Sequence, residues 1–167
     1  LGVRGRPVNR AGGGLDWVRR GGTLHDSGLT ARRGGRMSLL NVASPAYRAR
    51  HGIPRTPADL ARDGHVAVRY MSPANGRVEA WEWEENGTLH TLDLPGPVTV
   101  NSAETQIACC LAGLGLIQVP QYDVKPLVQS GELCAELPHW CAPAMPVNLL
   151  YPHRRHLSSR VQAFAGW

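Results

Sequence analysis

The residues best placed to do chemistry are Asn101 and Ser102, which stand between a predicted strand and a predicted helix. The β-branched residues 98–100 favour the strand, and the apolar residues behind the polar pair follow helical spacing. Asn101 can accept a bond from the backbone N–H three residues on, while Glu104 reaches back to it in a capping box. The free N–H groups and dipole of such a helix start also attract carboxylates. Two interpretations therefore stay open: a cap, or one wall of a ligand site.

Two other segments contain residue types that catalysis or metal binding would need. Residues 25–27 read His-Asp-Ser, but adjacent residues cannot form a hydrolytic triad, whose side chains converge from separate places. Cys134, His139 and Cys141 fit no structural zinc spacing and lack a fourth ligand. We therefore expect no catalytic residue, no metal and no cofactor, and we do not expect an enzyme.

The net charge of +5 is unevenly distributed along the chain. The first fifty residues contain ten arginines against only Asp16 and Asp26, and the remainder is slightly acidic. A basic segment can bind nucleic acid by neutralising phosphates, but no zinc-finger spacing, RNP-type motif or convincing helix-turn-helix occurs there. Residues 1–14 are rich in Gly and Arg without a period, which favours an unstructured, solvated tail.

Cysteine spacing and hydropathy indicate the cellular compartment in which the protein is expected. The four cysteines show no CxxC spacing, and two of them are adjacent within a helical pattern, as small buried hydrophobic residues would be: Cys109, Cys110, Cys134 and Cys141. No apolar run reaches the length of about eighteen residues that a membrane helix needs. A secretory signal is not seen. These observations favour a cytoplasmic protein without a membrane partner.

Hydrophobic period and turn residues predict the elements that would hold Asn101 and Ser102 in place. Helices are expected after the Ser-Pro and Thr-Pro starts at 44–45 and 56–57, over about 101–113, over 123–130 and over 158–167. Strands are expected at 15–18, 29–31, 38–43, 66–71, 98–100, 116–119, 133–137 and 147–151, with a hairpin around Asn86-Gly87. The alternation favours an α/β fold with a mainly parallel sheet.

Seven short segments occur in an order that resembles the effector-binding domain of LysR-type transcriptional regulators. Each is weak alone, but together they extend over residues 15–167: Arg19-Arg20-Gly21-Gly22 with Asp26-Ser27 and Ala31-Arg32-Arg33, Ala43-Ser44-Pro45-Ala46-Tyr47, Pro57-x-Asp59-Leu60, Val100-Asn101-Ser102-Ala103-Glu104, Leu111-Ala112-Gly113-Leu114-Gly115, Ser130-Gly131-Glu132-Leu133 and Tyr151-Pro152-x-Arg154-Arg155-His156-Leu157-Ser158.

The resemblance implies a two-lobed fold like that of periplasmic binding proteins. Residues 15–36 and 147–167 would form a partial first lobe, and residues 37–146 a nearly complete second lobe with the crossover segments. A small effector, anionic or aromatic, would bind between the lobes. The ligand-binding residues implied are Arg20, Gly21, Gly22, Thr23, Leu24, Asn101 and Ser102.

The resemblance also implies partners and raises an alternative. Full-length relatives have an N-terminal helix-turn-helix that binds DNA and they form homo-oligomers. Residues 1–14 do not resemble the helix-turn-helix part or about the first half of the first lobe. The sequence is therefore expected to be an N-terminally truncated form. The alternative is a stand-alone module that binds a small molecule or solute without binding DNA.

Overall fold

The computed structural model describes residues 18–21 and 29–152, and side chains between residues 35 and 147. Two compact units divide the chain: unit 1 contains Leu1–Met37 and Ala144–Trp167, and unit 2 contains Ser38–Pro143. The expected tail 1–14 and final helix 158–167 lie outside the described residues. Within the described residues, no helix combines the length and the apolar character that a bilayer crossing requires.

Unit 1 contains an antiparallel sheet in the order β1-β10-β2, made of Val18–Gly21, Met145–Pro152 and Leu29–Met37. β2 is longer than the predicted strand 29–31 and continues through Gly34-Gly35. The ladder accommodates the glycines with a register shift: Arg33 pairs with Asn148 and Gly35 with Val147. Gly35 has φ of 129°, a conformation open to glycine, so the strand continues through a bulge.

Unit 2 is built on a mixed sheet whose strands run in one direction except for β3 (Leu39–Ala43). β3 pairs antiparallel with β8 on one side and with β9 on the other. A parallel bridge from Ala67 to Leu116 carries the sheet from β8 to β4, which pairs parallel with β7. The prediction of a mainly parallel sheet is therefore wrong for the described strands: β3 pairs antiparallel on both sides, and the parallel pairings are β4–β7 and the bridge from Ala67 to Leu116. The strands around β3 are β4 (Arg69–Tyr70), β7 (Thr99–Val100), β8 (Ile117–Pro120) and β9 (Cys134–Glu136).

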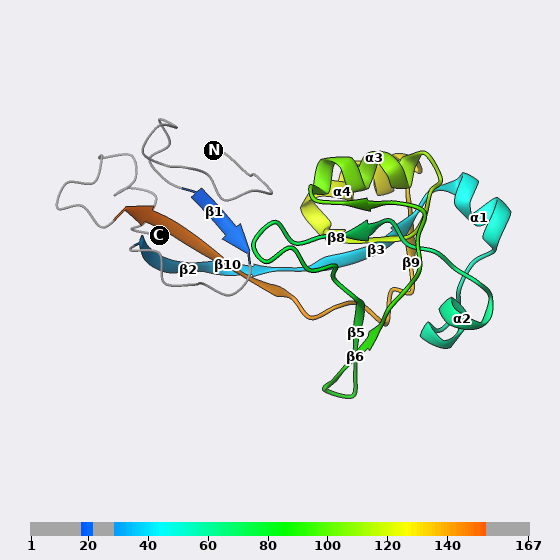
Figure 1. Ribbon diagram of the computed structural model, residues 1–167, viewed down its shortest axis with the longest axis horizontal. Coiled ribbons are helices and arrows are strands. Elements are labelled where there is room, and N and C mark those ends of the chain that lie inside the picture. Colours follow the sequence, from blue (N-terminus) through cyan, green and yellow to red (C-terminus); the bar gives the residue numbers. More distant parts are fainter. Residues whose placement is uncertain (1–17, 22–28, 153–167) are drawn as a thin grey trace. The chain divides into compact units, whose positions relative to one another are not determined.

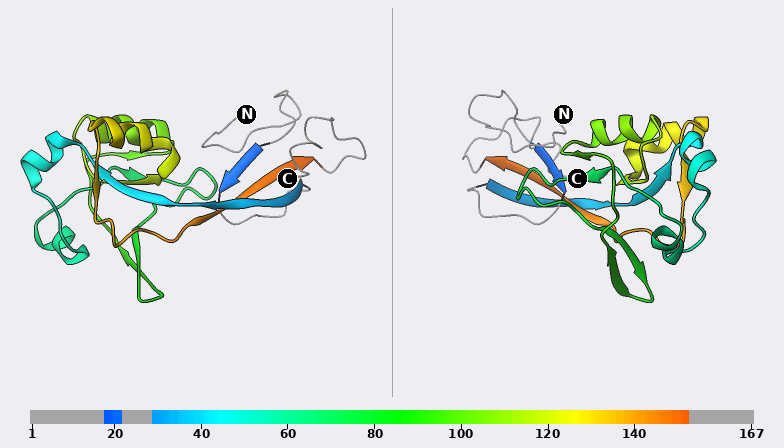
Figure 2. Two further views of the ribbon diagram at one scale, coloured as in Figure 1. Left: turned by 180° about the vertical axis from the view of Figure 1, so that it is seen from behind. Right: turned by 45° about the vertical axis from the view of Figure 1, so that its right-hand side comes forward.

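The central strands of unit 2 bury both faces, because neighbouring side chains such as Leu116 and Ile117 enter two different cores. The first core contains Ala43, Tyr47, Leu60, Ala67, Trp81, Leu94, Leu116 and Leu137. The second contains Val42, Val68, Cys110, Ile117, Val119, Val124 and Leu133. Figures 1 and 2 show helices α3 (Ala103–Leu111) and α4 (Gln121–Ser130) over one face of this sheet. The hairpin of β5 (Trp81–Glu85) and β6 (Thr88–Leu92) lies on the other side.

The helices of unit 2 begin where the sequence predicts or close to it. α1 (Pro45–His51) starts at Ser44, whose Oγ accepts the Tyr47 N–H at 3.2 Å. α2 (Pro57–Arg62) starts at Thr56, and the Asp59 carboxylate accepts the Thr56 N–H at 3.1 Å. Hydrogen bonds to backbone N–H groups, that of Arg55 foremost, lower the pKa of Asp59. α3 and α4 cover Ala103–Leu111 and Gln121–Ser130, and Gly131 ends α4 in the left-handed conformation.

The hairpin consists of β5 (Trp81–Glu85) and β6 (Thr88–Leu92), joined at Asn86-Gly87 as predicted. Both turn residues have positive φ, which the tight turn requires. Trp81 is 6% exposed within the first core, and Trp83 packs against that core while stacking on His90. Both indoles therefore pack at the first core.

Candidate functional site

Ser102, not Asn101, caps helix α3. Its Oγ accepts the Thr105 N–H at 3.2 Å and donates to Thr105 Oγ1 at 2.8 Å. The predicted capping box on Asn101 and Glu104 is therefore wrong by one residue. Val100 still pairs with Tyr70 in the sheet, so the extended chain continues through Ser102 before the helix begins. Asn101 and Ser102 are both partly exposed, so neither is enclosed by packed side chains.

A cavity of about 40 Å³ on unit 2 is lined by residues of β4, β5, β8 and helix α3, and Asn101 and Ser102 are not among them. Cavities of this size hold one or a few water-sized groups rather than a whole metabolite. We call it the α3 cavity, because Gln106 from the second turn of α3 forms part of its wall. Its lining residues are Ala67, Val68, Arg69, Tyr70, Glu79, Ala80, Trp81, Leu94, Gln106, Ile117 and Gln118.

Several polar groups of the α3 cavity are held in place by the sheet. The Gln106 side chain, 5% exposed, donates from Nε2 to the Val68 carbonyl at 3.1 Å. Burial raises the pKa of Tyr70, so its hydroxyl remains a hydrogen-bond donor at neutral pH. The buried Trp81 Nε1 has no hydrogen-bond acceptor within the described part of the chain. Such donors suit a ligand that carries oxygen acceptors.

The other residues predicted to bind the effector belong to unit 1. Arg20 and Gly21 lie on β1, opposite Asn148 and Val147 of β10. Gly22, Thr23 and Leu24 lie outside the described residues. Their role in binding therefore stays a prediction.

Sequence reasoning missed a row of polar side chains that crosses the sheet of unit 2. Asn41 on β3 lies opposite Gln118 on β8 and opposite Glu136 on β9. Asn41 and Glu136 are 1% and 2% exposed. The available signal was the position of each within an apolar strand, where a polar side chain needs a buried partner.

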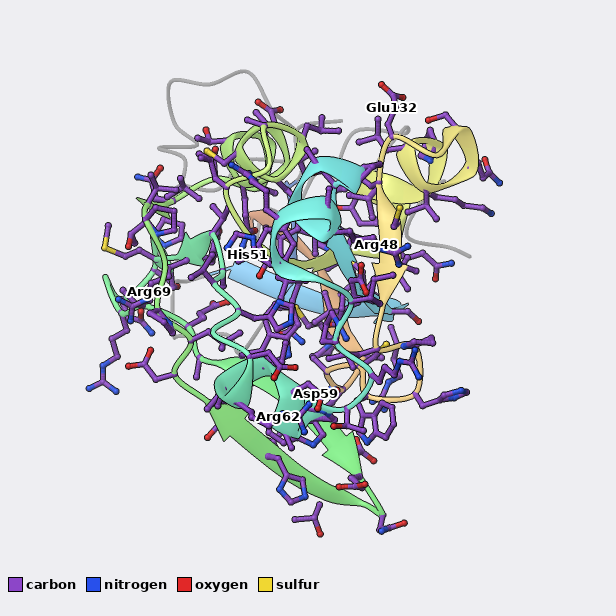
Figure 3. All side chains as sticks on the ribbon, turned by 90° about the vertical axis from the view of Figure 1, so that its right-hand side faces the viewer. Arg48, His51, Asp59, Arg62, Arg69 and Glu132 are labelled. Atoms are coloured by element: carbon purple, nitrogen blue, oxygen red, sulfur yellow. The ribbon has the colours of Figure 1, made fainter. Side chains whose placement is uncertain are left out.

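The other polar groups near the first core pair with one another around helix α1. Arg48 donates from Nε to Glu136 Oε1 at 2.5 Å, and the Tyr47 hydroxyl lies 2.8 Å from His65 Nδ1. The His51 ring stacks on Tyr47 with centroids 4.3 Å apart. Figure 3 shows Arg48 and His51 on one helix, with Arg69 well away from both. No group of three metal-ligating side chains occurs among the described residues.

Comparison with known proteins decides the family. The sequence model described as "LysR substrate binding domain" matches residues 2–167. The chain belongs to this family. Curated relatives of the LysR domain include the uncharacterized HTH-type transcriptional regulator YhjC of Escherichia coli K12, 37% identical over 162 residues that make up 97% of this chain and 54% of the relative. The HTH-type transcriptional activator AaeR of the same strain is 34% identical over 89% of this chain and 47% of its own length.

Solved structures give the LysR domain the same fold. The regulatory domain of CrgA, a LysR-type transcriptional regulator from Neisseria meningitidis, superposes with a TM-score of 0.75 at 26% identity, over 91% of this chain and 72% of that chain. The fold is therefore α/β and similar to that of periplasmic binding proteins, as predicted. The chain spans about half the length of the curated relatives it matches.

Proposed function

We propose that this chain is the effector-sensing part of a LysR-type transcriptional regulator and that it binds a small anionic or aromatic metabolite without catalysis. The family match over residues 2–167 carries the proposal. The α3 cavity supports it, because three side chains with hydrogen-bond donors, Tyr70, Trp81 and Gln106, line the same cavity. The relatives are named as transcriptional regulators, which favours this function over a stand-alone solute-binding module.

The proposed ligand site includes the N-terminus of α3 at Asn101 and Ser102. The first N–H groups of a helix have no acceptor within the helix. Ser102 Oγ satisfies that of Thr105, so those of Ala103 and Glu104 can serve a carboxylate. Arg20, Gly21, Gly22, Thr23 and Leu24 stay further candidates for effector binding, as the family resemblance implies.

The proposed assembly and location follow from the family. A longer protein of this kind would contact DNA through a helix-turn-helix outside the present sequence, as a cytoplasmic homo-oligomer. Effector binding would shift the population between two states that differ in their affinity for DNA. The size of that shift is set by how much more tightly the effector binds one state than the other.

The experiment is calorimetric titration of the protein with a panel of small aliphatic and aromatic carboxylates, repeated with Ser102→Asp. An aspartate still caps the helix, so stability stays within about 0.5 kcal/mol of the wild type, whereas affinity for a carboxylate falls by about tenfold or more because like charges meet. Thr88→Asp, which changes the net charge equally at the hairpin tip, is the control and leaves affinity unchanged. Ser102→Ala, which lacks the hydroxyl, also weakens binding.

Two results contradict the proposal. One is the failure of every carboxylate in the panel to bind the folded protein. The other is binding whose affinity is the same for Ser102→Asp and for the wild type, which would leave Ser102 with a capping role alone.

A further inference from the structure

A chain of amide hydrogen bonds connects the α3 cavity with the two places where the backbone leaves unit 2. Gln118, which lines the cavity, donates from Nε2 to Asn41 Oδ1 at 2.8 Å. Asn41 in turn donates from Nδ2 to the carbonyls of Trp140 at 2.9 Å and Leu137 at 3.4 Å. Asn41 lies on β3, just after the first unit boundary at Ser38, and residues 137–143 lead to the second boundary at Pro143.

The same Gln118 amide also fixes the hairpin. Its Nε2 donates to the Glu82 carbonyl at 2.7 Å, and its Oε1 accepts the Glu82 N–H at 3.0 Å. A side-chain amide that bonds both backbone groups of one residue takes the place of a neighbouring strand. β5 is thereby attached to β8 without a backbone ladder between them.

The two amides have one consistent orientation. Each primary amide offers two N–H groups and one oxygen. Gln118 gives its N–H groups to Asn41 and Glu82, and its oxygen accepts from Glu82. Asn41 gives both of its N–H bonds to the 137–140 turn and accepts from Gln118. Turning either amide over would set donor against donor, and because Asn41 is 1% exposed, water cannot replace a lost partner.

We propose that Gln118 is a positioning residue that couples ligand binding in the α3 cavity to both segments through which the backbone leaves unit 2. This inference rests on the proposed function, because it assigns a regulatory role to the same site. A polar ligand group that reaches the Gln118 amide competes for its N–H groups. Asn41 and Glu82 then lose a bond together, and the hairpin and residues 137–143 loosen as one unit.

Hydrogen–deuterium exchange on the whole chain tests the coupling without a ligand. Gln118→Met keeps the length of the side chain but has no amide. We expect exchange to become about fivefold faster or more in peptides covering β5 and residues 137–143, as the loss of buried hydrogen bonds implies. Gln106→Met is the matched control, because Gln106 lines the same cavity but bonds the Val68 carbonyl. Its effect is confined to residues 66–71 and helix α3.

If Gln118→Met does not fold, as judged by the absence of cooperative thermal unfolding, Gln118→Glu is used in the exchange experiment instead. That variant keeps the acceptor for the Glu82 N–H and removes both donors, so residues 137–143 still exchange faster. Unchanged exchange in residues 137–143, or an equal increase in the Gln106→Met protein, overturns the inference. The exchange experiment contains no ligand, so its result does not depend on effector binding. A negative exchange result overturns only the coupling, and a negative titration overturns only the proposed binding.

Discussion

At the scale of single residues, Gly115 lies next to the parallel bridge between Ala67 and Leu116 of unit 2. A Cβ atom there would lie 2.7 Å from both the Ala67 carbonyl carbon and the Val68 nitrogen. Both neighbours are backbone atoms of the parallel bridge beside β8, so neither can move without the sheet. Gly115→Ala should therefore lower the free energy of unfolding by about 2 kcal/mol, measured by chemical denaturation.

The control for Gly115 adds one heavy atom at a solvent-exposed position nearby. Ala112 is exposed at the end of α3. Ala112→Ser should change the free energy of unfolding by no more than about 0.5 kcal/mol. Equal stability of Gly115→Ala and the wild type would show that the strands can separate at this point.

Features fixed by near neighbours in the sequence could be predicted residue by residue. The Ser44 cap and the Asn86-Gly87 turn depend on contacts three residues apart or fewer, and both were predicted. The hydrogen bond between Gln118 and Asn41 joins residues 77 apart. No local pattern shows that two polar residues in separate apolar strands will lie opposite each other, so this part of the site required the structure.

At the scale of elements, helix α1 is joined to strand β9 by one buried ion pair. The Glu136 side chain is 1% exposed and that of Arg48 is 28% exposed, and Arg48 also donates to the Ala135 carbonyl. Burial raises the pKa of Glu136 despite the favourable contribution of Arg48. Arg48→Met leaves a buried carboxylate without its cation, and we expect a loss of about 3 kcal/mol in the free energy of unfolding near pH 7.

The pH dependence of that loss has a defined sign. A carboxylate whose folded-state pKa lies above its ordinary value binds more protons in the folded state, so lowering the pH favours folding. The deficit of Arg48→Met should shrink as the pH falls through the raised pKa of Glu136, as measured by urea denaturation at several pH values. Arg48→Met/Glu136→Gln is the control, with little deficit and little pH dependence. A deficit that persists unchanged at low pH contradicts this account.

The residues at which β2 ends and α4 begins are set by tertiary contacts, which amino-acid composition does not reveal. β2 continues beyond the predicted strand 29–31 to Met37, because β10 pairs with it on both sides of the bulge. Helix α4 begins at Gln121, two residues before the predicted start, where the Gln121 N–H bonds the Ser38 carbonyl. Hydrophobic period alone could not reveal either partner.

At the scale of the whole molecule, His65 makes the stability of the fold depend on pH. It is 2% exposed, and burial lowers its pKa even though Asp63 acts in the opposite direction. Below about pH 6.5 the unfolded chain binds a proton that the folded chain does not, so stability falls as the pH falls toward the folded pKa. The melting temperature should therefore drop between about pH 7 and pH 5.5.

Substitution of His65 tests whether this residue is the cause. His65→Gln should be less stable at pH 7, because the bond with the Tyr47 hydroxyl changes, but its melting temperature should vary less with pH. His90→Gln, on the hairpin, should keep the wild-type dependence. Parallel pH profiles for wild type and His65→Gln would assign the effect to other groups.

The fold class could be predicted at this scale because short family segments in a fixed order, together with alternating strands and helices, restrict the topology. The antiparallel direction of β3 could not, since the residue types of β3 do not show that it runs opposite to β8 and β9. Binding by Arg20–Leu24 stays a prediction, because Gly22, Thr23 and Leu24 lie outside the described residues.

The two-sided burial of the central strands limits how the length of this protein can vary. One additional residue in Leu116–Val119 would exchange the side chains between the two cores and turn Gln118 away from Asn41. The Asn86-Gly87 turn carries no such constraint, because residues 84–89 around it are exposed. Insertions and deletions should accordingly be tolerated at the hairpin tip and rejected in β8.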